Sequence, residues 1–286
     1  DHPFYSYDDW FISHKRNNSG IPEEIKNLSV TYDSQDPETL VNVFKKYKNK
    51  IACVITEPEN LKPLKKECIV EVEKITKRNK AIFIIDEMLS GYRAGFPGSY
   101  TKIGLNPDLT TWGKAIGNGY SFCALAGKKK IMQLGDIKQR NREKVFLLSS
   151  THGGETIGLA AGNKVIDIYK KKNVIKQHRK IIKTLDFYIN KEIISFGLKD
   201  YIKVFSSDWR IFLEFYDSKN KISDKFRTLF LQEMIKNNIL FQGIFLPCYR
   251  HSTSDINFIL KGFKNSCYIY KQALKDGISK YLIGKE

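Results

Sequence analysis

Three short segments of the chain carry residue types that could do chemistry together. The first is an acid, Asp86, which follows the apolar run 81–85 (AIFII) and precedes Glu87. Such a run predicts a buried strand. Ligands of open α/β sheets bind at the carboxyl ends of the strands, so this carboxylate is expected at a binding crevice. A carboxylate held there can pair with a protonated heterocyclic nitrogen.

The second segment is a lysine, Lys114, placed in the glycine-rich stretch 113–119 (GKAIGNG) directly after Trp112. Glycines let the backbone approach a flat ligand closely. A lysine withdrawn from water has a lowered pKa, which favours imine formation with a carbonyl compound. The segment therefore predicts a nucleophilic amine beside a planar ligand.

The third segment, 149–154 (SSTHGG), offers hydroxyl groups and free backbone N–H groups at the entrance to a predicted helix. Such a setting suits a phosphate group. Taken alone, each segment has an ordinary explanation as a strand end, a loop lysine or a helix entrance. Their order and spacing along the chain favour a single site.

The elements that must position these segments alternate between strands and helices in the first half of the chain. This alternation predicts an α/β fold with a mostly parallel sheet flanked by helices. The expected strands cover 51–56, 81–85, 122–126 and 145–148, and the expected helices cover 38–49, 64–75, 158–169 and 174–193.

After residue 200 the pattern changes. Residues 201–205 and 210–215 resemble antiparallel strands, and helical periodicity appears over 226–234 and 256–274, the latter opened by Ser254-Asp255. We therefore expect a large domain over 1–172 and a smaller α+β domain over 173–286.

Composition narrows the function classes. The 286 residues carry a formal charge of +17, but the lysines are spread along the chain without a zinc-finger, RNP or basic-zipper pattern, so nucleic acid is not the expected partner. The chain contains no run of 18 apolar residues, so the sequence predicts no membrane-spanning helix. The five cysteines show no CxxC spacing and the five histidines no HxxxH grouping. We expect free thiols, a cytoplasmic protein and no metal site.

The ordered motifs resemble those of the class III aminotransferases, which depend on pyridoxal 5'-phosphate (PLP). The branch related to glutamate-1-semialdehyde 2,1-aminomutase is the most similar. The motifs are 55–58 (ITEP), 85–93 (IDEMLSGYR), 107–109 (PDL), 113–119 (GKAIGNG), 151–154 (THGG), 229–234 (LFLQEM), 241–243 (FQG) and His251. The resemblance implies the PLP-dependent transferase fold type I, which is like that of aspartate aminotransferase.

The resemblance also implies roles for particular residues. Lys114 matches the Schiff-base lysine that holds PLP and then moves the substrate proton, and Asp86 matches the acid that binds the pyridine nitrogen. Met88 stands where a residue, commonly Val, packs on the ring face. Thr151 matches the threonine that reaches the phosphate of the neighbouring subunit's PLP, which implies a homodimer with active sites at the interface. Glu57 matches a glutamate near the site.

The chain departs from the family pattern at its beginning. The main phosphate-binding loop, a Gly-Ser-Glu-Ala type segment, is expected upstream of residue 1, so the chain is expected to be truncated at its N-terminus. Phe4 stands near the place of the aromatic residue that stacks on the other PLP face. Arg93 has two interpretations, either a structural partner of Glu87 or a contact for a substrate carboxylate.

The segment 117–121 (GNGYS) departs from the Gly-Gly-Gly form of the true aminomutase. We therefore expect a transaminase that moves an amino group between an amine or amino acid and a small keto or aldehyde substrate. Three alternatives stay open. They are an aminomutase-type isomerase, an inactive fragment without the phosphate-binding loop, and a basic nucleic-acid binder.

Overall fold

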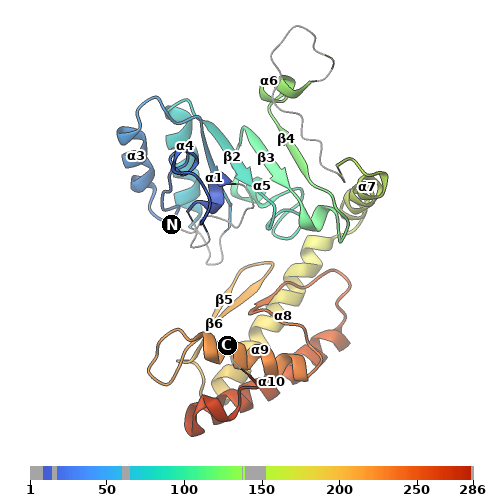
Figure 1. Ribbon diagram of the computed structural model, residues 1–286. Coiled ribbons are helices and arrows are strands. Elements are labelled where there is room, and N and C mark those ends of the chain that lie inside the picture. The colour runs from blue at the N-terminus through green and yellow to red at the C-terminus, as the bar shows by residue number, and fades with distance from the viewer. Residues whose placement is uncertain (1–8, 15–17, 60–64, 137, 139–152, 285–286) are drawn as a thin grey trace. The chain divides into compact units, whose positions relative to one another are not determined.

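The computed structural model describes residues 9–14, 18–59, 65–136, 138 and 153–284 (Figure 1). They form two compact units, of which the first extends to Lys170 and the second begins at Lys171. Each unit has its own apolar core. The expected strand over 145–148 lies outside the described residues.

The first unit contains a four-stranded sheet in the order β1-β2-β3-β4, with β4 at one edge (Figure 1). The first three strands are parallel and β4 is antiparallel, so the predicted mostly parallel sheet is confirmed. The register places Asp86 opposite Thr111. The strands are β1 (Cys53–Thr56), β2 (Ile82–Asp86), β3 (Leu109–Trp112) and β4 (Ala124–Gly127).

The core beside β1 and β2 is built by α3 (Pro37–Lys46) and α4 (Lys66–Arg78). Helix α3 begins where the Asp36 side chain accepts a hydrogen bond from the backbone N–H of Glu38. Pro37 in the first turn has no N–H group and so needs no acceptor there. Phe83 and Ile85 of β2 are fully buried in this core. Burial of alternate residues of β2 fixes the strand register. This register places Asp86 at the edge of the sheet where the parallel strands have their carboxyl ends.

Helix α7 (Thr156–Lys171) packs on the segment before β4 through two glycines. A Cβ atom at Gly158 would lie 2.6 Å from the Ser121 carbonyl oxygen, and one at Gly162 would lie 2.7 Å from the Phe122 ring. The helix expected over 158–169 is therefore confirmed, and Gly158 and Gly162 lie on the face by which it docks. Val165 of the same helix joins Ile116 in a small core just beyond Lys114.

The second unit contains a three-stranded antiparallel sheet in the order β5-β6-β7 with three helices. The antiparallel pairing expected over 201–215 is confirmed. Helix α10 begins with a reciprocal capping box between Ser252 and Asp255. The elements are β5 (Ile202–Ser206), β6 (Ile211–Phe215), β7 (Ile244–Phe245), α8 (Val174–Ser195), α9 (Asp224–Lys236) and α10 (Thr253–Asp276).

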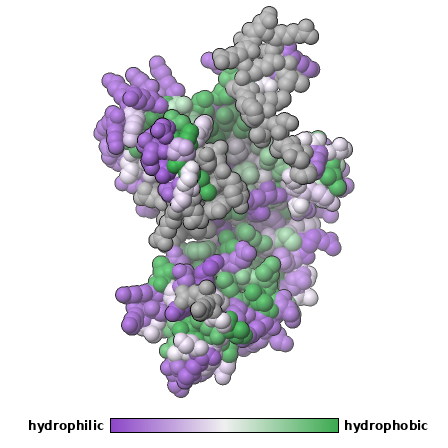
Figure 2. Space-filling model, in the orientation of Figure 1, coloured by the Kyte–Doolittle hydropathy of each residue, from purple (hydrophilic) through white to green (hydrophobic). Residues whose placement is uncertain are grey.

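Among the described residues, no helix combines the length and apolar character that a membrane span requires. Hydrophilic residues are spread over both units on the face shown in Figure 2.

Short elements connect the larger strands and helices. They are α1 (Asp9–Ile12), α2 (Glu23–Lys26), α5 (Ser99–Ile103), α6 (Lys129–Met132) and the 3-10 turns Lys114–Ile116, Gln133–Gly135 and Ile278–Lys280.

Candidate active site

Asp86 is the last residue of β2, and its side chain is only 5% exposed. One carboxylate oxygen accepts hydrogen bonds from the backbone N–H of Met88 (2.8 Å) and from the hydroxyl of Thr111 (3.1 Å). Burial raises the pKa of Asp86, while these hydrogen bonds and the nearby Lys114 ammonium group oppose the shift. The sheet therefore brings Asp86 and Lys114, which are far apart in sequence, to one edge.

Lys114 follows β3 and Gly113 and opens a 3-10 turn. Its backbone φ is +49°, in the left-handed region that residues with a Cβ rarely adopt. The Lys114 carbonyl accepts hydrogen bonds from the backbone N–H groups of Gly117 (3.1 Å) and Asn118 (3.0 Å), which hold this conformation. The site thus has a tightly fixed backbone at the lysine.

The Lys114 side chain is exposed. This differs from the lysine withdrawn from water that the sequence indicated, since Lys114 is exposed at the start of the 3-10 turn. An exposed amine is open to a ligand that approaches the sheet edge.

Met88 lies between the acid and the lysine. A Cβ atom at Gly113 would lie 2.9 Å from the Met88 sulfur, so the end of the Met88 side chain packs closely against Gly113. Met88 is half-buried, and its side chain packs against Gly113, the residue that precedes Lys114. A polarisable thioether at this point can contact the face of a planar ligand.

Glu87 follows β2, and its side chain has partners other than those of Asp86. It is fully buried, and burial raises its pKa to about 7 despite hydrogen bonds from Ser90, Ser99 and Tyr100. The Glu87 carboxyl group therefore has three neutral donors as partners, and not Arg93, which we considered as its structural partner. Among the described residues, Glu87 and Arg93 form no ion pair, and Arg93 donates instead to the Leu89 carbonyl (2.7 Å).

Glu57 follows β1 and is half-buried. Because β1 runs parallel to β2, with Thr56 opposite Ile85, Glu57 lies at the same sheet edge as Asp86. The expected site residues Thr151 and Phe4 lie outside the described residues. The structure therefore assembles the acid, the lysine, Met88 and the Glu57 position.

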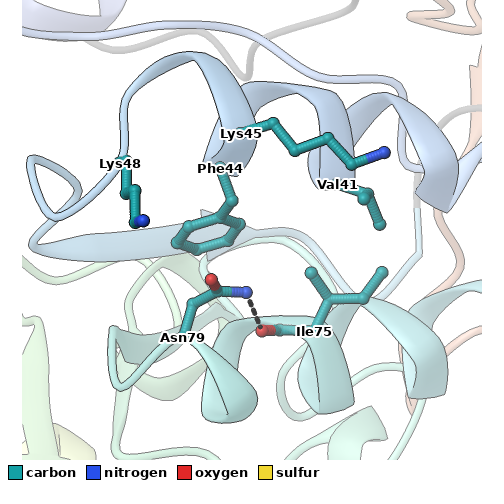
Figure 3. Close-up of a pocket in the computed structure, with 6 residues that line it drawn as sticks. All are labelled: Val41, Phe44, Lys45, Lys48, Ile75 and Asn79. Atoms are coloured by element: carbon teal, nitrogen blue, oxygen red, sulfur yellow. Dashed lines mark hydrogen bonds between the residues drawn. The ribbon is translucent and has the colours of Figure 1, made fainter.

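A surface pocket of the first unit lies elsewhere, between α3 and α4 (Figure 3). It combines an apolar floor with lysine side chains and contains none of the expected site residues. Its lining residues are Val41, Phe44, Lys45, Lys48, Ile75 and Asn79.

Comparison with known proteins decides the family. The family model described as "Aminotransferase class-III" matches residues 15–192. The chain belongs to the class III aminotransferases. Relatives include glutamate-1-semialdehyde 2,1-aminomutase from Sulfurihydrogenibium azorense, 33% identical over 166 residues, which are 55% of this chain and 37% of the relative. Another is 3-aminobutyryl-CoA aminotransferase from Cloacimonas acidaminovorans, 24% identical over 279 residues, which are 95% of this chain and 64% of the relative.

Solved structures confirm the predicted fold class of this class III chain. A transaminase with PLP bound superposes with a TM-score of 0.80 at 19% identity, covering 91% of this chain and 61% of that one. An omega-transaminase from Sphaerobacter thermophilus gives a TM-score of 0.78 at 15% identity, covering 89% and 60%. The predicted family and its relation to the aminomutase branch are also confirmed. The chain spans 37% and 64% of the two relatives named above.

Proposed function

We propose that this class III chain belongs to a PLP-dependent transaminase that moves an amino group from an amine or amino acid to a small keto or aldehyde substrate. One observation carries the proposal. The buried carboxylate of Asp86 and the exposed amine of Lys114 lie at the same sheet edge, close enough for the ammonium group to oppose the rise that burial causes in the pKa of Asp86. Acid and amine are the two groups that PLP chemistry needs from the protein.

The residues at this edge fit PLP. Asp86 would hold the pyridine nitrogen, because its carboxylate is fixed by two donors and shielded from water. Lys114 would hold the cofactor covalently through its Nζ atom, and Met88 would contact the ring face. PLP, when bound, supplies an electron sink that makes a proton of the amino substrate acidic.

Lys114 has a second task in this proposal. After releasing the cofactor, its amine would carry the substrate proton between two carbon atoms. The exposed side chain and the fixed backbone turn support this role, since the amine can move while its anchor stays in place. Asp86 would stay ionised through this transfer and keep the pyridine nitrogen protonated.

The remaining expectations are part of the same proposal. Thr151 and Phe4 would complete the cofactor site and Glu57 would lie near it, as the family resemblance implies. We also propose a cytoplasmic homodimer whose active sites lie at the subunit interface, and domains that meet at residue 172. The division of the chain between Lys170 and Lys171 supports that boundary.

Borohydride reduction tests the role of Lys114. In the protein that carries these residues, reduction with PLP present is expected to attach the cofactor irreversibly to Lys114, as located by peptide mass spectrometry. Lys114→Ala should abolish both the label and the visible absorption of bound PLP. Lys164→Ala, which removes an exposed lysine on α7, is the matched control and should retain both. A label on another residue, or none, would overturn the proposal.

An aminomutase is the second candidate, because relatives of this chain carry the name glutamate-1-semialdehyde 2,1-aminomutase. An aminomutase returns the amine to the molecule that supplied it and needs no external acceptor. A transaminase stalls after one half-reaction unless an acceptor is supplied. Sustained turnover of glutamate-1-semialdehyde without a keto acid would favour the aminomutase, and turnover that requires a keto acid favours the transaminase.

A further inference from the structure

The buried carboxylate of Glu87 ties together a loop beside the site. One oxygen accepts hydrogen bonds from the Ser99 hydroxyl (3.0 Å) and the backbone N–H of Tyr100 (2.8 Å), and the other accepts from the Ser90 hydroxyl (2.6 Å). These donors come from both ends of the loop 88–100. A single carboxylate thus closes the loop against the end of β2.

The loop is shaped to admit this carboxylate. A Cβ atom at Gly98 would lie 2.6 Å from a Glu87 oxygen, a distance that no real side chain tolerates. The Gly91 backbone N–H also donates to the Glu87 carbonyl (2.9 Å). Backbone and side chain of Glu87 therefore hold opposite ends of the same loop.

The closed loop in turn contacts β3 just before the lysine. The Trp112 indole N–H donates to the Pro97 carbonyl (3.0 Å), and a Cβ atom at Gly91 would lie 2.7 Å from the Trp112 ring. Trp112 is two residues from Lys114 and pairs with Ala124 in β4. The position of the loop and the position of the lysine turn are thus linked through Trp112.

We propose that Glu87 is a positioning residue that fixes the Lys114 turn by closing the loop 88–100 onto Trp112. This inference rests on the proposed function, because it assigns Glu87 to the site of Lys114. The Glu87 carboxyl group is held by Ser90, Ser99 and Tyr100, so Glu87 acts on the lysine turn through the loop. It also fixes Met88, since that residue lies in the loop between Glu87 and the Ser90 contact.

Hydrogen–deuterium exchange of the protein without added PLP tests this link. Glu87→Ala removes all three hydrogen bonds and should speed amide exchange about tenfold in both 88–100 and 109–118, as expected for losing at least one net hydrogen bond. Glu87→Gln keeps an acceptor oxygen and an N–H that a serine hydroxyl can accept, so exchange should stay near wild type. Ser99→Ala, a milder change, should raise exchange partway in both segments.

Glu73→Gln is the matched control. Glu73 is another buried glutamate of the same unit, where it pairs with Lys77 and accepts from the Asn106 backbone N–H (2.9 Å). Its loss should lower the melting temperature without speeding exchange in 109–118. If Glu87→Ala and Ser99→Ala speed exchange in 88–100 alone, or if Glu73→Gln gives the same pattern as Glu87→Ala, the proposal is wrong.

A cofactor measurement separates this inference from the proposed function. The dissociation constant of PLP should rise about tenfold in Glu87→Ala, a loss equal to one net hydrogen bond, and recover in Glu87→Gln. Failure of the wild-type protein to bind PLP would defeat the proposed function while leaving the exchange result to decide the link. Wild-type binding with an unchanged constant in Glu87→Ala would defeat the inference alone.

Discussion

Two adjacent carboxyl groups of this chain have different surroundings. Asp86 accepts two hydrogen bonds and has the Lys114 ammonium group nearby, whereas Glu87 is buried among neutral donors. Burial raises the pKa of both groups. The Lys114 ammonium group opposes the rise at Asp86, whereas the charge of Glu59 adds to the rise at Glu87. Neighbouring residues of one strand end can therefore serve a cofactor and a loop separately.

The pH dependence of stability should report on Glu87. In the folded chain Glu87 keeps its proton up to about pH 7, whereas the unfolded glutamate loses it near 4.5. The folded state therefore binds more protons between these values, so its free energy of unfolding falls as pH rises through this window and is level above it. The glutamine of Glu87→Gln does not titrate, so the free energy of unfolding of this variant should lack the decline of about 3 kcal/mol that Glu87 causes over this window.

Denaturant unfolding of wild type and Glu87→Gln from pH 4.5 to 8 measures this difference. The two curves should diverge with rising pH, the variant becoming the more stable one. A Glu87→Gln curve that runs parallel to wild type would show that Glu87 titrates normally in the folded chain.

At this scale the sequence predicted Asp86 and Lys114 because a strand end and a glycine-rich lysine segment are local patterns. It did not predict the partners of Glu87, since Ser99 and Tyr100 approach it only after the loop 88–100 folds back. The exposure of Lys114 was also not predicted, since the glycine-rich segment has no periodic pattern that separates buried from exposed positions.

At the scale of elements, β3 is the least predictable part of the site. Its four residues, Leu109–Trp112, show no clear apolar alternation, and the sequence was interpreted only as the approach to the lysine. Pairing with β2 on one side and β4 on the other makes it a strand. Tertiary pairing thus outweighs local propensity, as is common for short strands. The helices, with longer periodic patterns, were located correctly over most of their lengths.

The docking of α7 on the segment before β4 gives an element-scale prediction. Gly158→Ala should destabilise the first unit by about 1–3 kcal/mol, because the new methyl group would lie 2.6 Å from the Ser121 backbone oxygen, which cannot move freely. The strain should outweigh the gain of up to about 1 kcal/mol in helix propensity. Chemical denaturation measures the change, and Asn163→Ala, at an exposed position of the same helix, is the control. A more stable Gly158→Ala protein would show that α7 does not dock through this glycine.

At the scale of the whole molecule, the change of pattern near residue 200 reflects two separate cores. The core of the second unit is built by α8, β5, β6, α9 and α10, and the cores of the first unit lie beside β1, β2 and the Lys114 turn. A change from parallel to antiparallel patterning is visible in sequence because the two sheet types bury their strands differently. The segment over 139–152 lies outside the described residues, so the predicted phosphate contact at Thr151 stays a prediction.

Separate cores predict separate responses to a core defect. Tyr270 of α10 is fully buried, and its hydroxyl donates to the Tyr216 carbonyl (2.6 Å) near the Tyr201 carbonyl (3.1 Å). Tyr270→Phe keeps the ring but withdraws this donor, which should destabilise the second unit by about 1–3 kcal/mol. Amide exchange should therefore rise in β5 and β6 and stay unchanged in β1, β2 and β3.

Tyr268→Phe is the control for this last prediction, because Tyr268 is 53% exposed on the same helix and its change should leave exchange in both sheets as in wild type. An equal rise in both sheets of Tyr270→Phe would mean that the two units unfold as one cooperative body. A rise confined to β5 and β6 would mean that the sheet edge with Asp86 and Lys114 keeps its geometry when the second unit loosens. The acid and the lysine would then owe their placement to the first unit alone.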